Sequence, residues 1–558
     1  MTKQPNNPEL NMSASVNGST LLPATLAALL LFGLQATAHA GSATWDHNPK
    51  NGDWNTARNW TLQTVPNGPD DVAIFESSAT TEVALSAAVE LNEIEFRPEA
   101  PSFIVSLSPN APLTLSGKGI TNLSTATEGL YAGGLSGGPG AITFRNRATV
   151  RGPVTMGTRS GGTSSRGVIT FSDTSNASIS SSADVEYIND AGGRDSLAGE
   201  IVFTGSSTAG KVFIENSGGL FARDSAKAFI IFMQSSNAGQ SIIGDEGGEA
   251  RHAPGGETDF MDSSSAADVE IFTGAPYNGG LGGSIKFFGD STGGQCMLGL
   301  GAKGTLDISA HNPPGLTIGA LVSANASKSA VVFLGGNNLV IGQTQYPFAE
   351  FNGAIEDGGV AGGVGGSITK IGPGSLTFTG ANRFTGGTVV SAGAFTVANA
   401  GGSATGTGPV SITRGYLAGS GIIAGPVTIG TGNGSGAFLE PAYDYPRPRT
   451  LTIQNTLTFA ADGTYIYSVE APKNAVHADQ VIAAGVTIEA GARFSFVGDK
   501  RQAVAVGTVF TVIDNTSASP IAGTFANLPD GSTFDAGPNT YLANYEGGDR
   551  NDLTLTVQ

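Results

Sequence analysis

A short pattern that recurs at a nearly constant spacing limits what this chain can fold into more than any other feature. In five segments, a phenylalanine is followed by serine four residues later and by alanine or glycine six residues later. Successive phenylalanines lie 32, 29, 28 and 27 residues apart. A period of this size is typical of solenoids, in which each unit buries its apolar face only against its neighbours. The phenylalanines are Phe171, Phe203, Phe232, Phe260 and Phe287.

Each unit predicts two short strands that are joined by a Ser/Thr-rich turn and followed by a glycine-rich loop. The second strands are expected at residues 211–214, 241–243 and 269–272. Glycine interrupts every stretch that could carry a helical period, so long helices are excluded. We therefore expect the phenylalanines to stack in register inside a coil of strands, with Ser and Thr side chains bonded to backbone groups at the corners.

The composition excludes two classes of partner. The chain has 558 residues, of which 82 are glycine and only 13% are charged. Its net charge is −18, and no run of Lys or Arg occurs. Nucleic acids and anionic membrane surfaces both reward clustered positive charge, so neither is expected as a partner. No residue pattern indicates a cofactor, and none is expected.

The N-terminus predicts an export signal. Residues 21–34 are almost wholly apolar, and Ala38-His39-Ala40 supplies the small residues of a cleavage site. No later stretch approaches a membrane span. We expect residues 1–40 to be a signal peptide and the mature chain to be secreted or held at the cell surface. The single cysteine, Cys296, leaves no intrachain disulfide, which in an exported chain favours a bacterial origin, and a buried position is expected for it.

Residues 41–125 form an aromatic-rich entry followed by short strand patterns. All three tryptophans, Trp45, Trp54 and Trp60, lie here. Their indoles are suited to cover the open end of a solenoid, and stacking on sugar rings is the alternative. Residues 126–365 form the β-helix repeat region, whose glycine-rich first part, 126–165, is expected to contain loops.

Residues 366–415 carry a second pattern, in which glycines separate alternating apolar residues. Leu376, Phe378, Val390 and Phe395 are expected to face inward on alternating strands, and the glycines allow the tight turns between them. The pattern resembles the autotransporter-associated beta-strand repeat, in which Phe384 stands at a position usually held by tyrosine. The matching positions are Lys370, Gly372, Gly374, Leu376, Phe378, Gly380, Asn382, Phe384, Gly386, Gly387, Thr388, Val390, Gly393 and Phe395.

Residues 416–558 look like the segment that follows such repeats in large exported bacterial proteins, and a C-terminal β-solenoid or β-rich region is expected there. The resemblance implies an all-β fold: a right-handed parallel β-helix passenger with a β-rich C-terminal segment, located on the bacterial surface. It implies no assigned activity. Autotransporters end in a membrane β-barrel, and the residues up to Gln558 predict none, so the route past an outer membrane stays open.

Two functions of different classes fit this fold, because fold alone does not choose between them. The first is a noncatalytic scaffold or adhesin, with surface glycans or other extracellular polymers as partners. The alternative is a polysaccharide lyase or hydrolase, which needs paired carboxylates in the case of a hydrolase. The candidate acids form two clusters, one of Asp184, Glu186, Asp190 and Asp195, the other of Asp245, Glu246 and Glu249 with Arg251 and His252.

A solvated glycine-rich loop is the favoured interpretation of the second cluster, so no catalytic residue is assigned. Residues 547–553 resemble one calcium-binding nonapeptide, but Arg550 replaces a glycine and the pattern occurs once. Calcium rolls need stacked copies, so a turn is expected, with Asp549 and Asp552 as the residues to test. No zinc, P-loop or nucleophile-elbow pattern occurs, and no metal ligand is assigned.

Overall fold

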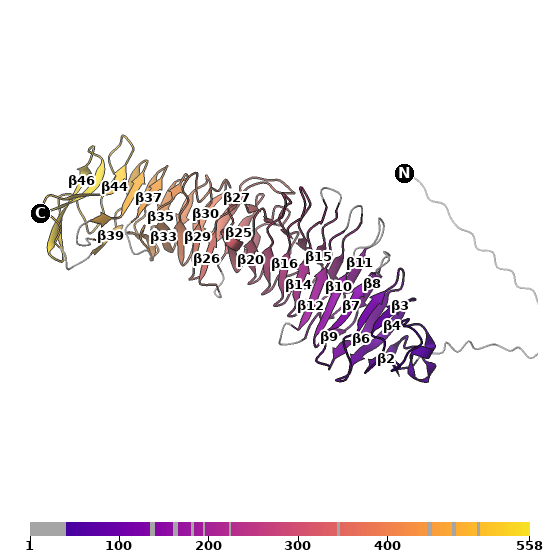
Figure 1. The fold of residues 1–558 in the computed structure, drawn as a ribbon. Coiled ribbons are helices and arrows are strands. Elements are labelled where there is room, and N and C mark those ends of the chain that lie inside the picture. The colour runs from indigo at the N-terminus through magenta and orange to yellow at the C-terminus, as the bar shows by residue number, and fades with distance from the viewer. Residues whose placement is uncertain are drawn as a thin grey trace, which may run out of the picture. The chain divides into compact units, whose positions relative to one another are not determined.

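Successive coils of short β-strands make up the folded part of the chain (Figure 1). A computed structural model describes residues 41–133, 140–159, 166–179, 184–192, 196–221, 225–342, 346–443, 449–470, 476–498 and 503–558. The expected signal peptide, residues 1–40, lies outside the described residues. Most strands pair in parallel with a strand from the next coil. The expected all-β parallel β-helix with a β-rich C-terminal segment is confirmed.

The N-terminal coils are built on two sheets. The first sheet has 14 strands: β1 (Ala43–Thr44), β2 (Gly68–Phe75), β4 (Val89–Phe96), β6 (Leu113–Asn122), β8 (Gly140–Phe144), β9 (Thr149–Arg151), β11 (Gly167–Phe171), β13 (Glu200–Phe203), β15 (Phe229–Phe232), β17 (Glu257–Phe260), β19 (Ser284–Phe287), β21 (Thr305–Asp307), β24 (Val331–Phe333) and β27 (Ala354–Glu356). The second has 10 strands: β3 (Glu82–Leu85), β5 (Ile104–Leu107), β7 (Glu128–Ala132), β10 (Val154–Thr158), β12 (Val185–Asn189), β14 (Phe213–Asn216), β16 (Ile242–Asp245), β18 (Glu270–Thr273), β20 (Met297–Leu300) and β23 (Ala320–Ser323).

Three further sheets carry the C-terminal coils. The third sheet contains β22 (Gly315–Ile318), β25 (Asn338–Ile341), β28 (Ser367–Lys370), β30 (Gly387–Val390), β32 (Val410–Ile412), β35 (Val427–Ile429), β38 (Leu457–Phe459) and β42 (Val486–Ile488). The fourth contains β26 (Phe348–Phe351), β29 (Ser375–Phe378), β31 (Ala394–Val397), β33 (Gly415–Gly419), β36 (Ala437–Leu439), β39 (Gly463–Glu470), β40 (His477–Ala478) and β43 (Arg493–Gly498). The fifth contains β34 (Ile422–Ile423), β37 (Thr450–Ile453), β41 (Gln480–Ala483), β44 (Val509–Asn515), β45 (Thr533–Ala536), β46 (Asn539–Gly547) and β47 (Asp552–Val557).

Helical turns are short and few in the described ranges. They are the 3₁₀ helices η1 (Ala57–Asn59), η2 (Thr61–Gln63) and η3 (Ala324–Ala326). Among the residues that the structure describes, no helix has the length and apolar character that a membrane crossing requires.

A column of phenylalanine rings runs through the core of the N-terminal coils. The ring centroids of Phe171, Phe203 and Phe232 are 5.0 and 4.7 Å apart, with interplanar angles of 8° and 7°. Phe260 and Phe287 continue the stack at 4.9 and 4.7 Å. All five side chains are fully buried. The rings overlap because each phenylalanine ends a strand of the first sheet and pairs in register with the next one.

The serine and the small residue of the repeat also lie inside the coil. The hydroxyl of Ser207 donates to the carbonyl of Phe171 at 3.1 Å, and Ser236 donates in the same way to Phe203 at 3.1 Å. The residue between serine and the small residue forms an isolated parallel bridge with its equivalent one coil away, as Thr208 does with Asn237. The pattern therefore marks one corner of the coil, where the hydroxyls of Ser207 and Ser236 satisfy backbone carbonyls. The equivalent hydroxyls of Ser175, Ser264 and Ser291 are buried without a hydrogen-bond partner among the described residues.

The glycine-rich part at residues 126–165, where loops were expected, also contains the strands β7, β8, β9 and β10. Phe144, at the end of β8, extends the ring column: its centroid is 4.5 Å from that of Phe171. Ala148 occupies the place of the serine in this coil, which is why the repeat pattern does not reveal it.

A column of polar side chains lies at the ends of the second-sheet strands, inside the coil. Asn189 accepts a hydrogen bond from the Thr158 hydroxyl at 2.6 Å and donates to Asn216 at 2.8 Å. Asn216 donates in turn to Asp245 at 2.6 Å, and Thr258 donates to the same Asp245 oxygen at 2.9 Å. The members are fully buried, so each coil is tied to the next by a side-chain bond that water does not weaken.

Three indoles close the N-terminal end. Trp45, Trp54 and Trp60 are at most 2% exposed, and Trp60 contacts the other two rings at centroid distances of 5.0 and 4.8 Å. Residues 52–54 pair with the outer edge of β3, where Ala84 N–H donates to Gly52 at 2.8 Å and Trp54 N–H donates to Ala84 at 2.9 Å. The indoles are a cap, and their burial excludes the alternative of sugar stacking.

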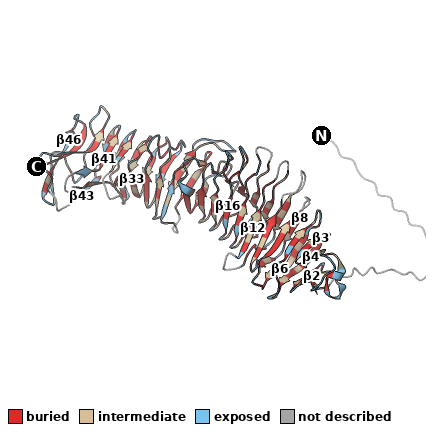
Figure 2. Ribbon diagram, viewed as in Figure 1, coloured by how far each residue is buried: buried red, intermediate tan, exposed pale blue. Residues whose placement is uncertain are grey.

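The second repeat pattern places its apolar residues in the core. Leu376, Phe378, Val390 and Phe395 are at most 1% exposed, and Phe384 is fully buried. Gly387 has φ +97° at the start of β30, and a Cβ there would lie 2.4 Å from the carbonyl oxygen of Pro409. Gly386 is similarly crowded by the carbonyl oxygen of Gly365 at 2.2 Å. Figure 2 shows buried residues alternating with more exposed ones along the strands.

Candidate functional site

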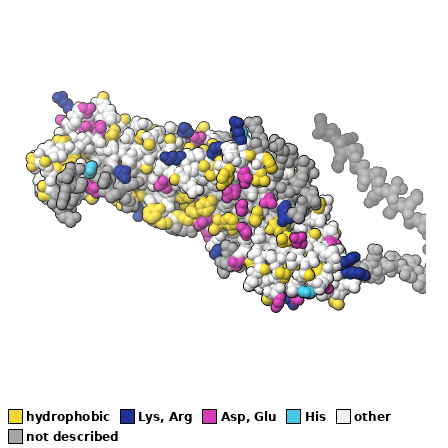
Figure 3. Space-filling view, in the orientation of Figure 1, with side chains coloured by type: hydrophobic (Ala, Val, Ile, Leu, Met, Phe, Trp, Pro, Cys, Tyr) yellow, Lys and Arg dark blue, Asp and Glu magenta, His cyan; other side chains and the backbone are white. Residues whose placement is uncertain are grey.

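The outward face of the fourth sheet carries an aligned row of side chains. Strand pairing puts Phe348, Ser375, Ala394, Tyr416 and Phe438 in register across β26, β29, β31, β33 and β36. Their neighbours along each strand point into the core, because side chains alternate between the two faces. Phe348 is 74% exposed. In Figure 3, hydrophobic side chains gather over this part of the coil.

Three aromatic rings in this region contact one another at the surface. The centroids of Tyr416 and Phe438 are 4.7 Å apart with an interplanar angle of 20°. Tyr443 also contacts Tyr416, with its ring centroid 4.5 Å from that of Tyr416. All three rings are half-buried. Mutual contact holds the rings in place while part of each aromatic surface stays open to solvent.

Four glycines lie at the same corner of successive coils, next to the aromatic rings. Their bare backbone forms the surface that we call the floor. Gly372, Gly393, Gly415 and Gly436 all have positive φ, between +70° and +98°. This backbone conformation favours glycine, since a side chain would be strained there. A Cβ on Gly415 would also lie 2.2 Å from the carbonyl oxygen of Gly393. The turn therefore removes side chains from four successive coils and leaves the backbone bare.

The buried side chain of Lys370 binds the glycine corner from inside the coil. Its ammonium group donates to the carbonyls of Ile371 at 2.6 Å, Gly372 at 2.9 Å and Ala392 at 3.3 Å. The side chain is 1% exposed, and burial lowers the pKa of Lys370 to about 8. The lysine that opens the repeat thus satisfies three carbonyls of the glycine corner, which fixes the floor.

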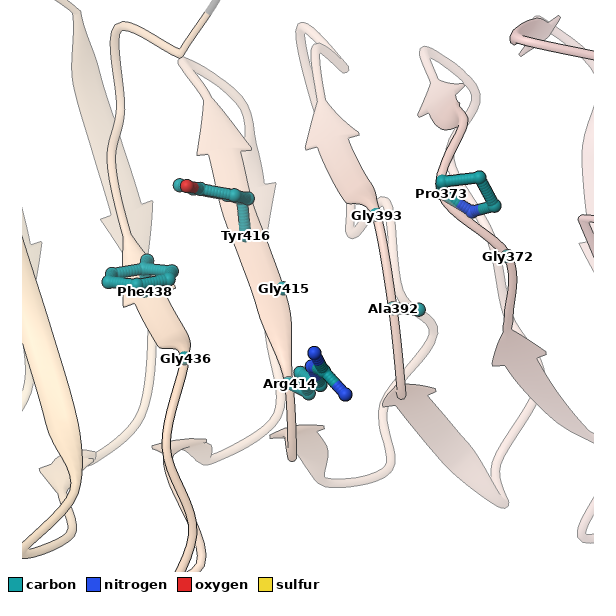
Figure 4. Close-up of a pocket in the computed structure, with 9 residues that line it drawn as sticks. All are labelled: Gly372, Pro373, Ala392, Gly393, Arg414, Gly415, Tyr416, Gly436 and Phe438. Carbon is teal, nitrogen blue, oxygen red and sulfur yellow. The ribbon is translucent and has the colours of Figure 1, made fainter.

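Together these residues enclose a hollow with a volume of about 500 Å³, hereafter the aromatic hollow (Figure 4). Pro373 lies at one end and Phe438 at the other, with Arg414 and Tyr416 between them. Because adjacent strands are about 4.8 Å apart, four coils span about 14 Å along the coil axis. The lining is Gly372, Pro373, Ala392, Gly393, Arg414, Gly415, Tyr416, Gly436 and Phe438.

The aromatic hollow combines three kinds of recognition. The ring faces of Tyr416 and Phe438 carry negative electrostatic potential and attract the weakly positive C–H groups of a ligand. The exposed guanidinium of Arg414 supplies forked N–H donors for hydroxyl or carboxylate oxygens. The bare floor lets a ligand approach the backbone closely. None of the nine described lining residues carries a carboxyl group.

The acid cluster at residues 245–252 is divided between the inside and the outside of the coil. Asp245 is fully buried in the polar column, and burial raises its pKa to about 8. Glu246, Glu249, Arg251 and His252 are exposed. Asp245 therefore cannot share a sugar substrate with the acids that follow it, and the interpretation of the whole cluster as a solvated loop is wrong for Asp245.

The acidic cluster at residues 184–195 is also divided between different surroundings. Glu186 lies on the outward face of β12, Asp184 is exposed just before the strand, and Asp190 follows it half-buried. Burial raises the pKa of Asp190. Asp195 lies outside the described residues. Nothing in this arrangement places two carboxyl groups across a hollow of the described chain.

The remaining candidates have structural surroundings. Asp549 lies in the turn between β46 and β47, and Asp552 accepts a hydrogen bond from the Asn515 N–H at 2.9 Å. Across the described ranges, no group of three or more His, Cys, Asp or Glu side chains is arranged to hold a metal ion. Cys296 is fully buried, and burial raises the pKa of its thiol to about 12.

The aromatic hollow did not emerge from the sequence, although part of it adjoins a recognised pattern. Gly372 and Gly393 were assigned to turns, but Tyr416 and Phe438 follow no repeat. A usable signal was present: both aromatic residues precede a buried leucine, Leu417 and Leu439, so strand alternation puts the rings outside.

Comparisons with known proteins agree with the repeat pattern. The family model of the passenger-associated-transport-repeat matches residues 368–397, which include part of the aromatic hollow. A crystal structure of the Haemophilus influenzae Hap adhesin is 9% identical, with a TM-score of 0.26, over 87% of this chain and 64% of that chain. The chain thus spans less than two thirds of that solved protein, and a likeness of this size carries no functional argument. No curated protein matches the chain.

The resemblance carried by residues 366–415 is confirmed by the family match, and the surrounding coils form the parallel β-helix that the resemblance implies. The chain is accordingly similar to autotransporter passengers: its β-helix contains, at residues 368–397, a match to the passenger-associated-transport-repeat.

Proposed function

We propose that this protein is an exported, noncatalytic β-helix that binds glycan polymers outside the cell through the aromatic hollow. The observation that carries the proposal is the stack of Tyr416 and Phe438 beside Arg414, over a floor of glycines. Aromatic faces with a few placed polar donors are what a hydroxyl-rich ring with apolar C–H faces requires. The apolar residues 21–34 and the small residues before Gly41 support export by a signal peptide.

The shape of the aromatic hollow favours a polymer over a single sugar. Its walls come from four successive coils, so a ligand lying along the coil axis contacts Pro373, Arg414, Tyr416 and Phe438 in turn. Phe348 belongs to the same outward row and is 74% exposed, so a longer ligand meets a further ring along this face. Several weak contacts in a row give affinity to a chain molecule that one contact cannot give.

The absence of carboxyl groups among the described lining residues supports binding without cleavage. A glycosidase acts with two carboxyl groups about 5–10 Å apart on either side of the bond. The acids favoured for catalysis are divided instead, with Asp245 inside the coil and Glu246 outside. An adhesin or scaffold role therefore accounts for the surface better than polysaccharide cleavage does.

Affinity measurements on immobilised and soluble polysaccharides test this proposal. The wild-type protein is run through native gels that contain bacterial or plant polysaccharides, and positive ligands are titrated by calorimetry. Tyr416→Ala and Arg414→Gln are each expected to lower the association constant at least about tenfold, which corresponds to the loss of a stacking or forked contact. Tyr277→Ala is the matched control, because Tyr277 is 68% exposed and does not line the aromatic hollow.

Melting curves and circular dichroism of every variant check that the fold is retained. Retardation of the wild type that survives Tyr416→Ala, Phe438→Ala and Arg414→Gln would place glycan binding elsewhere and overturn the role of the aromatic hollow. Failure of the wild type to bind any polysaccharide in the panel would overturn glycan binding itself.

A further inference from the structure

A second hollow, far along the chain from the aromatic one, has a different chemistry. It lies on the outward face of the first sheet over β4, β6 and β9, near the indigo end of the ribbon in Figure 1, and has a volume of about 550 Å³. We call it the charged hollow. Its lining is Glu93, Glu95, Gly117, Lys118, Thr121, Leu123, Arg147, Thr149, Arg151 and Ile179.

Strand register gives the charged hollow an acidic side and a basic side. Glu95 on β4 pairs with Thr121 on β6, and Thr121 pairs with Arg151 on β9. Two strand spacings separate Glu95 from Arg151, which is about 9.5 Å. Gly119 lies between Glu93 and Thr149 in the parallel row, so no side chain separates those two residues, whereas Thr121 stands between Glu95 and Arg151.

The carboxylates on the acidic side already have cationic partners. Glu93 is buried, and its carboxylate contacts the Lys118 ammonium at 3.0 Å and accepts a hydrogen bond from the Thr121 hydroxyl at 2.8 Å. Glu95 contacts the Arg97 guanidinium at 3.1 Å. Arg97 also contacts Glu76 at 2.8 Å, so two carboxylates share this guanidinium. Both oxygens of Glu93 are engaged and its side chain is 4% exposed, whereas the side chain of Glu95 is 25% exposed and can accept from ligand hydroxyls.

The guanidinium groups on the basic side have no such compensation. Arg147 and Arg151 are exposed, and within the described ranges neither forms an ion pair with a carboxylate. In a chain with a net charge of −18, two uncompensated arginines beside a hollow are a local reversal of sign. Arginine matches the planar geometry of carboxylate and sulfate groups and forms paired hydrogen bonds with them.

We propose that the charged hollow is a binding site for the carboxylate- or sulfate-bearing sugars of an anionic polysaccharide. The guanidinium groups of Arg147 and Arg151 bind the anionic group, and the hydroxyls of the same ring donate to Glu95. Leu123 and Ile179, which are 52% and 43% exposed, cover the apolar edges of the ring.

The experiment compares Arg147→Gln/Arg151→Gln with a control double variant, Arg58→Gln/Arg251→Gln. Both remove two positive charges, and Arg58 and Arg251 are exposed and do not line the charged hollow. Each double variant is made in the full chain that also carries Tyr416→Ala, so that the aromatic hollow contributes little to the measured affinity. A failure of the proposal for one hollow can then be told apart from a failure of the proposal for the other. The probes are polygalacturonate, dextran sulfate, a neutral dextran and double-stranded DNA.

The charged-hollow variant is expected to lose at least about tenfold in affinity for polygalacturonate or dextran sulfate, and its salt dependence is expected to become shallower. A loss of affinity for polygalacturonate alone would identify the bound group as a carboxylate, and a loss for dextran sulfate alone would identify it as a sulfate. Arg151→Lys, which keeps the charge without the fork, is expected to lose several-fold. Equal losses in the control variant, no loss in either anionic arm, or DNA binding as tight as the anionic polysaccharides would overturn the proposal.

Discussion

Asp245 shows how a single side chain can be part of the interior and still respond to pH. It continues a column of asparagines and accepts hydrogen bonds from Asn216 and Thr258 through one carboxyl oxygen. The other oxygen, Oδ2, is buried without a hydrogen-bond partner among the described residues. Burial is the largest cause that raises the pKa of this carboxyl to about 8, and the charges of Glu257 and Asp259 add to it.

The stability of the protein is therefore expected to fall as pH rises from 5 to 8. The pKa of Asp245 is higher in the folded protein, about 8, than in the unfolded chain, about 4. Its contribution to the free energy of unfolding is therefore fully present below pH 4 and is lost as pH rises through about 8. Burial also raises the pKa of Asp259 and Glu128 to about 7, in the same direction. Thermal melts across this range check the slope; a rising or flat profile would contradict it.

Asp245→Asn is expected to flatten that profile and to raise stability above pH 8 by about 1–3 kcal/mol, since the amide carries no charge to bury. The asparagine would continue the column that Asn189 and Asn216 form. Glu249→Gln, an exposed acid a few residues away, is the control and should leave the profile unchanged. A destabilised Asp245→Asn at pH 9 would show that the carboxylate is preferred there.

Phe232 tests the ring column. Its neighbours Phe203 and Phe260 stack on both sides at 4.7 and 4.9 Å, so Phe232→Ala leaves a cavity between two rings. We expect a cost of about 3–5 kcal/mol. Hydrogen exchange in β13 and β17 should speed up, because each coil is held chiefly by its neighbours. Phe348→Ala, at an exposed ring, should change the melt little; an unchanged melt for Phe232→Ala would count against the column.

At the scale of elements, the glycine corner links the repeat to the binding surface. Gly372, Gly393, Gly415 and Gly436 each turn the chain from the third sheet into the fourth with a positive φ. Lys370 binds the carbonyls of this corner from inside, and Tyr416 follows Gly415 directly on the outside. The same backbone geometry that winds the coil also keeps the floor of the aromatic hollow free of side chains.

Two glycines of this corner give a matched pair of substitutions. A Cβ at Gly415 would lie 2.2 Å from a backbone oxygen, whereas at Gly436 the nearest atoms are 3.9 Å away. Gly436→Ala should cost about 1–2 kcal/mol, from the backbone conformation alone. Gly415→Ala should cost more, because the next coil must move as well. Denaturant titration compares the two, and equal costs would mean that the coils shift apart easily.

The repeated elements were the part of the fold that sequence could predict, because period and alternation are written in single residues. Phe144 was not predicted to belong to the ring column, because Ala148 stands where the pattern requires serine. Asp245 was taken for a loop residue, since only the pairing of β14 with β16 shows that it lies beside Asn216. Arg151 and Glu95 are 56 residues apart in sequence and meet one hollow only through the strand register.

At the scale of the whole molecule, the two proposed binding sites lie on different sheets of the coil. The aromatic hollow lies on the fourth sheet and the charged hollow on the first. A polymer with both neutral and anionic sugars can be held at both places, and two linked contacts strengthen each other through their high effective concentration.

Incubation with polygalacturonate or other acidic polysaccharides is accordingly expected to give no cleavage. The acids of the charged hollow are bound to Lys118 and Arg97, and the aromatic hollow is lined by none. Ultraviolet absorbance of unsaturated sugars and reducing-end assays measure this directly. Product that forms with the wild type and disappears with Glu93→Gln would show an enzyme instead.

The tryptophan cap bears on how neighbouring molecules meet one another. The end of a β-helix offers unpaired amide and carbonyl groups, to which a strand of a second chain can add, and repeated addition yields a fibre. Here residues 52–54 occupy the outer edge of β3, and three buried indoles fill the space behind them. A strand of a second chain therefore gains no backbone hydrogen bonds where residues 52–54 already pair with β3, and we expect this edge to resist head-to-tail addition.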